Sequence, residues 1–132
     1  MYKSESQFKR DLITNLEKKG WFCQKIESEG TGVGIPDLYI TKDECSAWLE
    51  LKNEPANYNK GKIEVHWRPG QQAWAIHFAK KSIIPTATII AFKNGIAAIR
   101  TGLELFQDNI VPAKNVCFYK NVQEFIDKLR EN

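Results

Sequence analysis

Two carboxylates and an ammonium occur among the apolar residues of one short segment, PDLYITKDECSAWLELK, at residues 36–52. They belong to Asp37, Glu50 and Lys52. Carboxylate oxygens are the ligands that hard divalent cations such as Mg²⁺ prefer. A lysine beside a metal-bound water can hold or deprotonate that water, so the three residues could form a metal-dependent reaction centre. Alternatively, they could form a solvated, ion-paired face of a β-hairpin.

The alternation of side chains predicts an antiparallel hairpin with its turn centred between Asp43 and Glu44, in which Asp37 faces Glu50. One face is then uniformly apolar and carries Leu38, Ile40, Ala47, Leu49 and Leu51. The other face carries Asp37, Glu50 and Lys52 together with Tyr39 and Trp48, which makes it half-apolar and partly covered. Directly opposed like charges destabilise a sheet. A cation between the carboxylates therefore explains the pattern better than a solvated face, unless a bulge shifts the register.

Three short motifs resemble those of a known nuclease superfamily. Pro36-Asp37 followed by Glu50-Leu51-Lys52 resembles the signature of the PD-(D/E)XK nucleases. Together with Gly34-Ile35 and Gln71-Gln72-Ala73-Trp74, the pattern is similar to the virus-type replication-repair nuclease (VRR-Nuc) and Holliday-junction resolvase branch. The resemblance spans about residues 4–81. It implies a restriction-endonuclease-like α/β fold and divalent-metal-dependent hydrolysis of DNA phosphodiester bonds, with Mg²⁺ or Mn²⁺ as cofactor.

The resemblance also assigns roles to single residues. Asp37 and Glu50, with the carbonyl of Leu51, would hold the metal, and Lys52 would orient or activate the attacking water. Gln71 would position metal, water or phosphate, the alternative being a polar residue that caps its own helical turn. Glu5 falls within the apolar stripe of the first helix and fits an additional metal ligand, or else a charge stabilised by the helix dipole.

Candidate DNA contacts lie between the hairpin and Gln71. The basic residues there are Lys60, Lys62 and Arg68, interleaved with His66 and with the aromatic residues Tyr58 and Trp67. Basic and aromatic side chains suit contact with the DNA backbone and stacking on bases, a solvated loop being the alternative. Lys9, in contrast, is expected to be plain surface.

The glycine-rich loop at residues 29–34 offers a different candidate. Its Gly30-Thr31-Gly32 resembles the start of a dinucleotide fingerprint, but that fingerprint follows a strand and opens a helix. Here the loop runs into a strand, so no nucleotide cofactor is expected. Gly32 would instead let DNA or metal approach the backbone closely.

The elements that position these residues follow from periodicity and capping. Ser4 and Gln7 form a capping box before an apolar stripe, which predicts a helix over about residues 5–19. The other predicted elements are a strand over Trp21–Glu27, the hairpin, a short extended piece near Ile63–Trp67, a helix over Gln71–Lys81, two strands joined by Asn94-Gly95, a short helix near Leu103–Gln107, a strand over Val116–Tyr119 and a last helix that includes Leu129. This order predicts a mixed central β-sheet flanked by helices, with an α-β-β-β-α-β core.

Length and composition limit the remaining choices. The 132 residues fit one domain spanning residues 1–132, and the net charge of +3 requires that any nucleic-acid contact use clustered cations. No apolar run is long enough for a membrane span, and the N-terminus lacks the apolar core of a signal peptide. Three widely spaced cysteines suit a reducing compartment, and two histidines are too few for a histidine-rich metal site. A cytoplasmic protein is expected.

The most direct interpretation is an endodeoxyribonuclease selective for branched DNA such as a Holliday junction, because so small a chain has little room for a sequence-reading module. The resemblance alone adds a symmetric homodimer and a phage or mobile-element origin. Two alternatives remain open: a sequence-specific restriction- or homing-type endonuclease, and a non-catalytic DNA-binding module on a nuclease fold.

Overall fold

The computed structural model describes residues 2–27, 34–59 and 61–129, so the predicted contacts at Gly32 and Lys60 lie outside the described residues. Its helices are α1 (Glu5–Lys18), α2 (Gln71–Ala79) and α3 (Val122–Asp127), with single 3₁₀ turns η1 (Gln107–Asn109) and η2 (Ala113–Asn115). Its strands are β1 (Phe22–Lys25), β2 (Leu38–Lys42), β3 (Cys45–Asn53), β4 (Lys62–Glu64), β5 (Thr86–Phe92), β6 (Gly95–Thr101), β7 (Ile110–Pro112) and β8 (Val116–Tyr119).

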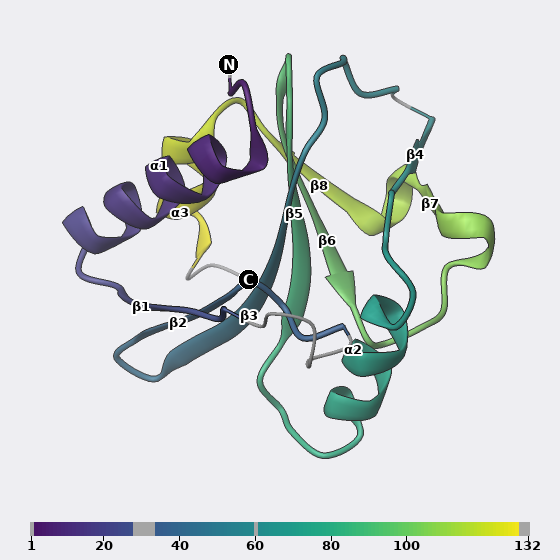
Figure 1. Ribbon diagram of the computed structural model, residues 1–132, viewed down its shortest axis with the longest axis horizontal. Coiled ribbons are helices and arrows are strands. Elements are labelled where there is room, and N and C mark those ends of the chain that lie inside the picture. Colours follow the sequence, from purple (N-terminus) through teal and green to yellow (C-terminus); the bar gives the residue numbers. More distant parts are fainter. Residues whose placement is uncertain (1, 28–33, 60, 130–132) are drawn as a thin grey trace.

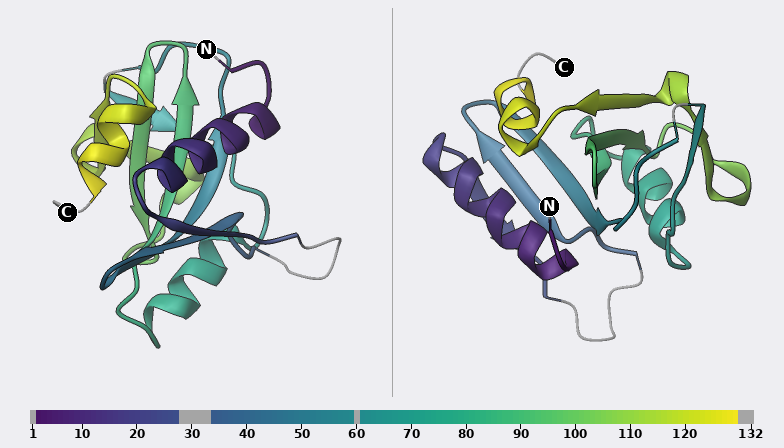
Figure 2. Two further views of the ribbon diagram at one scale, coloured as in Figure 1. Left: turned by 90° about the vertical axis from the view of Figure 1, so that its left-hand side faces the viewer. Right: turned by 90° about the horizontal axis from the view of Figure 1, so that it is seen from above.

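A six-stranded mixed sheet in the order β1-β2-β3-β5-β6-β8 forms the centre of the described structure (Figure 1). Its β3 and β5 strands pair in parallel, whereas the other neighbours are antiparallel. Helices α1 and α3 cover one face, and α2 with the small β4-β7 sheet lies on the other (Figures 1 and 2). This confirms the predicted α/β fold with a helix-flanked mixed sheet. No helix among the described residues has the length and apolar character of a membrane span.

Helix α1 begins where the capping pattern predicts. The Ser4 side chain accepts a hydrogen bond from the Gln7 N–H at 3.1 Å, and the Gln7 side-chain oxygen accepts one from the Lys3 N–H at 2.6 Å. Phe8, Leu12 and Leu16 are fully buried against the sheet. Each such burial contributes roughly 1.5–3 kcal/mol, so this stripe fixes the helix against the hairpin.

The hairpin has the predicted register. Leu38 pairs with Leu49, Tyr39 with Trp48 and Ile40 with Ala47. The predicted apolar face is buried in one hydrophobic cluster with α1 and α3, which includes Leu38, Ile40, Leu49, Leu51, Phe8, Leu12 and Phe125. On the opposite face the Trp48 ring packs edge-on against Trp74 and Phe78 of α2. Strand β3 therefore carries a core on one side and a partly covered polar site on the other.

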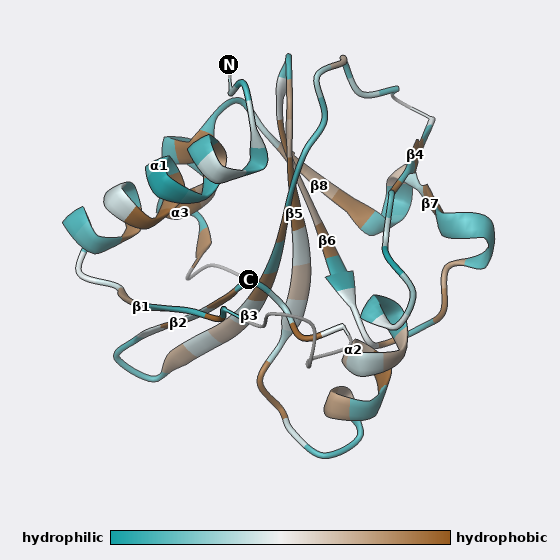
Figure 3. Ribbon diagram, in the orientation of Figure 1, coloured by the Kyte–Doolittle hydropathy of each residue, from teal (hydrophilic) through white to brown (hydrophobic). Residues whose placement is uncertain are grey.

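A second hydrophobic cluster lies on the α2 side of the sheet, beneath β4 and β7. It contains Ile63, Val65, Trp67, Ile90, Ala97, Ile99, Phe106 and Val111. Figure 3 shows hydrophobic residues along the central strands and hydrophilic ones over much of the connecting loops. The central strands are thus buried on both faces, and polar residues within them require a specific reason.

The predicted helix near Leu103–Gln107 does not form; the chain makes only the η1 turn slightly later. Phe106 explains the difference, because its ring is 6% exposed in the second cluster and stacks on Trp67. Its backbone N–H donates to the Gln72 side chain at 2.9 Å, and its carbonyl accepts from the same side chain at 3.3 Å. Tertiary contacts of this kind hold the segment extended.

The β5-β6 turn also differs from the predicted Asn94-Gly95 connection. Phe92 pairs with Gly95, so the two turn residues are Lys93 and Asn94, and Gly95 begins β6. A Cβ atom on Gly95 would lie 2.5 Å from the Tyr119 carbonyl oxygen. The glycine is therefore required by the close approach of β8.

Candidate active site

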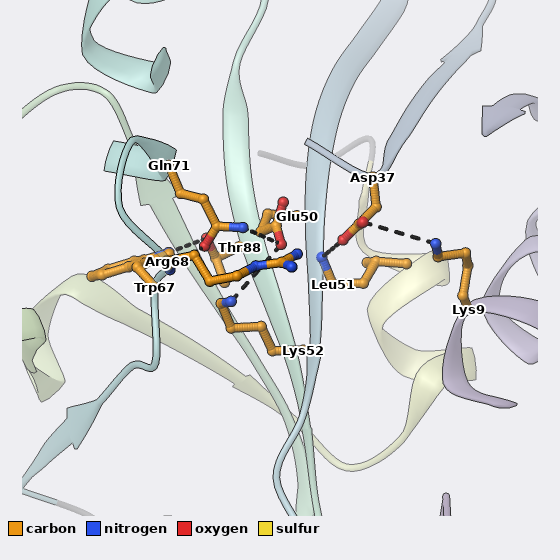
Figure 4. Close-up of polar contacts among 9 residues, drawn as sticks. All are labelled: Lys9, Asp37, Glu50, Leu51, Lys52, Trp67, Arg68, Gln71 and Thr88. Carbon is orange, nitrogen blue, oxygen red and sulfur yellow. Dashed lines mark hydrogen bonds and ion pairs between the residues drawn. The ribbon is translucent and has the colours of Figure 1, made fainter. Parts of the chain in front are cut away.

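Glu50 is a carboxylate within the central sheet, only 4% exposed, on the face of β3 opposite α1. Its Oε2 atom accepts a hydrogen bond from the Gln71 Nε2 atom at 2.8 Å, and the Lys52 Nζ atom lies 3.8 Å away (Figure 4). Gln71, at the first turn of α2, is itself 8% exposed, and its Oε1 atom accepts from the Arg68 N–H at 2.8 Å. The predicted residues Glu50, Lys52 and Gln71 are thus brought together.

The surroundings of Glu50 disfavour its charged form. Burial raises the pKa of Glu50, the neighbouring carboxylate of Asp37 raises it further, and Lys52 and Arg68 oppose this, so that the pKa is raised to about 8. A buried carboxyl group next to another carboxylate holds its proton, because burial and the repulsion between two negative charges both disfavour its ionised form. A divalent cation would replace that proton and remove the conflict.

Asp37 lies one residue before β2, where the strand ladder stops. Because β3 continues past this point, the N–H of Leu51 has no strand partner on that side, and the Asp37 Oδ2 atom accepts from it at 2.9 Å. The Asp37 Oδ1 atom lies 3.8 Å from the Lys9 Nζ atom of α1. Asp37 therefore contacts the backbone of Leu51 and, from its position just before β2, raises the pKa of Glu50 on β3 (Figure 4).

Lys9 was expected to be plain surface, and that expectation is wrong. Its ammonium faces Asp37, and its side chain is only 29% exposed. Helical periodicity places Lys9 next to the buried Phe8, but it carries no information about which loop lies opposite. The contact could not be read from the sequence.

The approach of residue 34 to α2 fixes the distance between the two halves of the site. Gly34 has a φ of +85°, and a Cβ atom there would lie 2.1 Å from the Gly70 carbonyl oxygen. Gly70 caps α2 immediately before Gln71. The chain that leads to Asp37 therefore packs directly on the backbone that presents Gln71.

Arg68 and Thr88 extend the polar site. Thr88 pairs with Glu50 in the β3-β5 ladder and accepts a hydrogen bond from the Trp67 Nε1 atom at 2.9 Å. Arg68 is exposed, and Figure 4 shows its side chain reaching toward Glu50 and Lys52. Trp67 is 8% exposed, so it serves the core and the predicted base stacking by it is wrong.

The other predicted residues lie at the edge of the site or outside it. Tyr58 is partly exposed and stacks on Phe118 with ring centroids 4.3 Å apart, and its stacking on DNA stays a prediction. Lys62 is exposed at the start of β4. His66 is exposed and lies 3.3 Å from the Glu54 carboxylate.

The sequence left two roles open for Glu5, a metal ligand directed toward the sheet and a charge at the helix N-terminus. The first turn of α1 lies before the buried stripe, and Glu5 is exposed. It lines a small cavity of about 110 Å³ together with Lys52, Glu54 and Glu64. Among the described residues no group of three or more His, Cys, Asp or Glu side chains is arranged to hold a metal ion. Among the described residues, Asp37 and Glu50 are the two carboxylates that the pKa of Glu50 shows to interact with each other.

We expect replacement of Gln71 by leucine to lower the free energy of unfolding by about 1–3 kcal/mol, because a buried charged or polar group loses its donor. Urea denaturation at neutral pH measures this. Gln123→Leu, at an exposed position of α3, provides the control and should change stability little. Equal effects of both substitutions would contradict the role assigned to Gln71.

The raised pKa of Glu50 predicts a pH dependence of the protein without divalent metal. The folded state binds a proton that the unfolded chain releases between the ordinary pKa near 4.5 and about 8. Stability should therefore fall as the pH rises through this window, by up to about 1.4 kcal/mol per pH unit. Denaturation in EDTA across this range tests it. Glu50→Gln should remove the slope, and an unchanged slope would contradict the assignment.

No protein-family model matches the sequence, and no curated protein matches it. Among solved structures, the fold is similar to that of Hjc, a Holliday junction resolvase from the archaeal hyperthermophile Archaeoglobus fulgidus. The two chains share 15% sequence identity and superpose with a TM-score of 0.62 over 83% of this chain and 88% of Hjc. This chain therefore has a resolvase-like, restriction-endonuclease-like fold.

Proposed function

We propose that the chain is a divalent-metal-dependent endodeoxyribonuclease that acts on branched DNA. The observation that carries this proposal is Glu50, a buried carboxyl group whose pKa is raised by burial and by the neighbouring Asp37. Its direct partners are Gln71 and Lys52. Such an arrangement of buried ionisable groups does not stabilise a core. The resolvase-like fold and the motif resemblance support the same activity.

The donors present fit a hard divalent cation. Mg²⁺ is usually held by one or two carboxylates while keeping waters and substrate phosphate oxygens as its other ligands. Asp37 and Glu50, with the carbonyl of Leu51, would hold Mg²⁺ or Mn²⁺, and Glu5 remains a prediction for a further ligand. When bound, the ion would polarise the scissile phosphate and lower the pKa of a bound water.

The other side chains at the site would activate the water, position Glu50 and contact the DNA. The Lys52 side chain is 12% exposed, so its amino group is held beside Glu50. As an ammonium it would orient the attacking water, and as a neutral amine it would accept the water's proton at the Nζ atom. Gln71 would keep Glu50 in place through its hydrogen bond. Arg68, exposed above the carboxylates, would contact the phosphodiester backbone. The family resemblance implies products with a 5′-phosphate and a 3′-hydroxyl.

Branched DNA is the proposed substrate class because recognition by shape requires no separate sequence-reading module. A Holliday junction has two symmetric strands to cut, so a symmetric homodimer of VRR-Nuc or resolvase type would match it. The similarity of the fold to that of a junction resolvase supports this choice over a restriction or homing activity.

Incubation with labelled four-way junction, flap, single-stranded and linear duplex DNA, in Mg²⁺ or Mn²⁺, tests the proposal. We expect symmetric cuts in the junction that disappear with EDTA and with Asp37→Ala. Cleavage of linear duplex at one recurring sequence would instead indicate a restriction- or homing-type enzyme. Binding of all substrates without any cleavage would indicate a non-catalytic DNA-binding module.

A further inference from the structure

A cavity of about 660 Å³ lies on the α1 side of the molecule, away from Glu50. It is bounded by α1, the β5-β6 turn and the start of α3, which meet at the end of the fold where the N-terminal segment runs (Figures 1 and 2). None of Asp37, Glu50, Lys52 and Gln71 lines it. Its volume falls within the roughly 300–1,000 Å³ typical of small-molecule sites.

The charged side chains around this cavity are mostly cationic. Arg10 of α1, Lys93 of the β5-β6 turn and Lys120 before α3 line it, and within the described parts of the chain none of the three forms an ion pair. The lining carboxylate, Asp11, already accepts hydrogen bonds from the Tyr2 hydroxyl and from the Asn15 amide. Three cations from separate segments thus line the cavity beside a single carboxylate, which leaves an excess of positive charge.

Part of the cavity wall is apolar, and the polar residues Gln7, Thr14 and Asn121 complete it. Tyr2, Phe92, Ile96 and Val122 line it. The Tyr2 ring packs on Phe8 with centroids 5.1 Å apart, its hydroxyl is bound by Asp11, and its carbonyl accepts from the Asn53 side chain at 3.3 Å. A ligand with an anionic part and a flat apolar part would therefore find complementary groups without rearranging the site.

We propose that this cavity binds a phosphate-bearing ligand of mononucleotide size, present either as a free nucleotide or as the phosphorylated end of a DNA strand. Arg10, Lys93 and Lys120 bind the phosphate, since ionised donors form the strongest hydrogen bonds to phosphate oxygens. The apolar part of the wall, which includes Tyr2 and Ile96, accommodates the base and sugar. The site is distinct from the proposed catalytic site and adds a second contact for nucleotides.

Titration of the ¹⁵N-labelled full chain with dAMP, in EDTA and at physiological salt, tests this by NMR. We expect saturable shifts of the amides of Lys93, Gly95 and Asn121, and none with deoxyadenosine, which lacks the phosphate. Arg10→Gln/Lys93→Gln/Lys120→Gln should weaken dAMP binding at least about tenfold. Lys18→Gln/Lys81→Gln/Lys114→Gln removes the same charge from exposed positions outside the cavity and should leave binding unchanged.

Competition then identifies the source of the phosphate. Displacement of dAMP by a 5′-phosphorylated oligonucleotide, but not by its 5′-hydroxyl form, would assign the cavity to strand ends. Failure of both oligonucleotides to compete would assign it to free nucleotides. Absence of saturable shifts with dAMP, or equal weakening by the two triple variants, would overturn the proposal.

Discussion

Replacement of Lys52 by methionine is expected to slow DNA strand cleavage on the order of 10²- to 10⁴-fold, the range that a positioned proton-transfer group contributes. The Lys52 ammonium lies 3.8 Å from Glu50, in a side chain that is 12% exposed. Methionine fills similar space without the charge, so the core should persist. Because Lys52 is largely covered, it contributes little to the outer surface that meets the DNA backbone.

Single-turnover cleavage of a four-way junction measures this effect, and fluorescence anisotropy in Ca²⁺ measures binding separately. Lys114→Met, at an exposed position in η2, makes the same chemical change away from the site. We expect the control to cleave at the wild-type rate and both variants to bind the junction as wild type does. Wild-type cleavage by Lys52→Met would remove Lys52 from the mechanism.

Replacement of Gly34 by alanine is expected to lower the free energy of unfolding by more than about 2 kcal/mol and to abolish cleavage. A residue other than glycine with a positive φ costs about 1–2 kcal/mol by itself. The added Cβ would also meet the Gly70 carbonyl oxygen at 2.1 Å, a backbone atom that has no rotamer to change. The chain before Asp37 must then move away from the start of α2, which separates Asp37 from Gln71.

Gly61→Ala is the matched control, because the nearest atom to its added Cβ is the Asn59 Oδ1 atom at an ordinary 3.8 Å. Urea denaturation gives the stability of both variants, and cleavage at a temperature where both are folded gives the effect on the site. If the two alanine variants were equally stable and active, the contact between Gly34 and Gly70 would not position the site.

The hairpin could be predicted from the sequence because alternation over two strands fixes both faces at once. The buried face needs Leu38, Leu49 and Leu51 together, which leaves only one register for Glu50. Helix α1 followed for the same reason, since its cap and its apolar stripe agree. Where local patterns agree with each other, they predict the position of a helix or strand as well as its type.

Contacts between distant segments could not be predicted in this way. Helical spacing shows which side of α1 faces the core, but not how far each position is covered, so the exposure of Glu5 at the edge of the sheet could not be predicted. For the same reason the ion pair of Lys9 could not be predicted, because its partner Asp37 is distant in the sequence. Trp67 alternates with basic residues as DNA-contacting aromatics do, yet it is buried in the second hydrophobic cluster on the sheet.

End-group analysis of the products from a four-way junction, incubated with Mg²⁺ and either wild type or Asp37→Asn, tests the central claim most directly. Asparagine retains an oxygen that can accept the Leu51 N–H, so it preserves the fold while removing the charge. We expect wild type to release strands with a 5′-phosphate and a 3′-hydroxyl, only in the presence of metal, and Asp37→Asn to release none. Equal cleavage by both proteins, or cleavage that persists in EDTA, would contradict a metal-dependent site at Asp37 and Glu50.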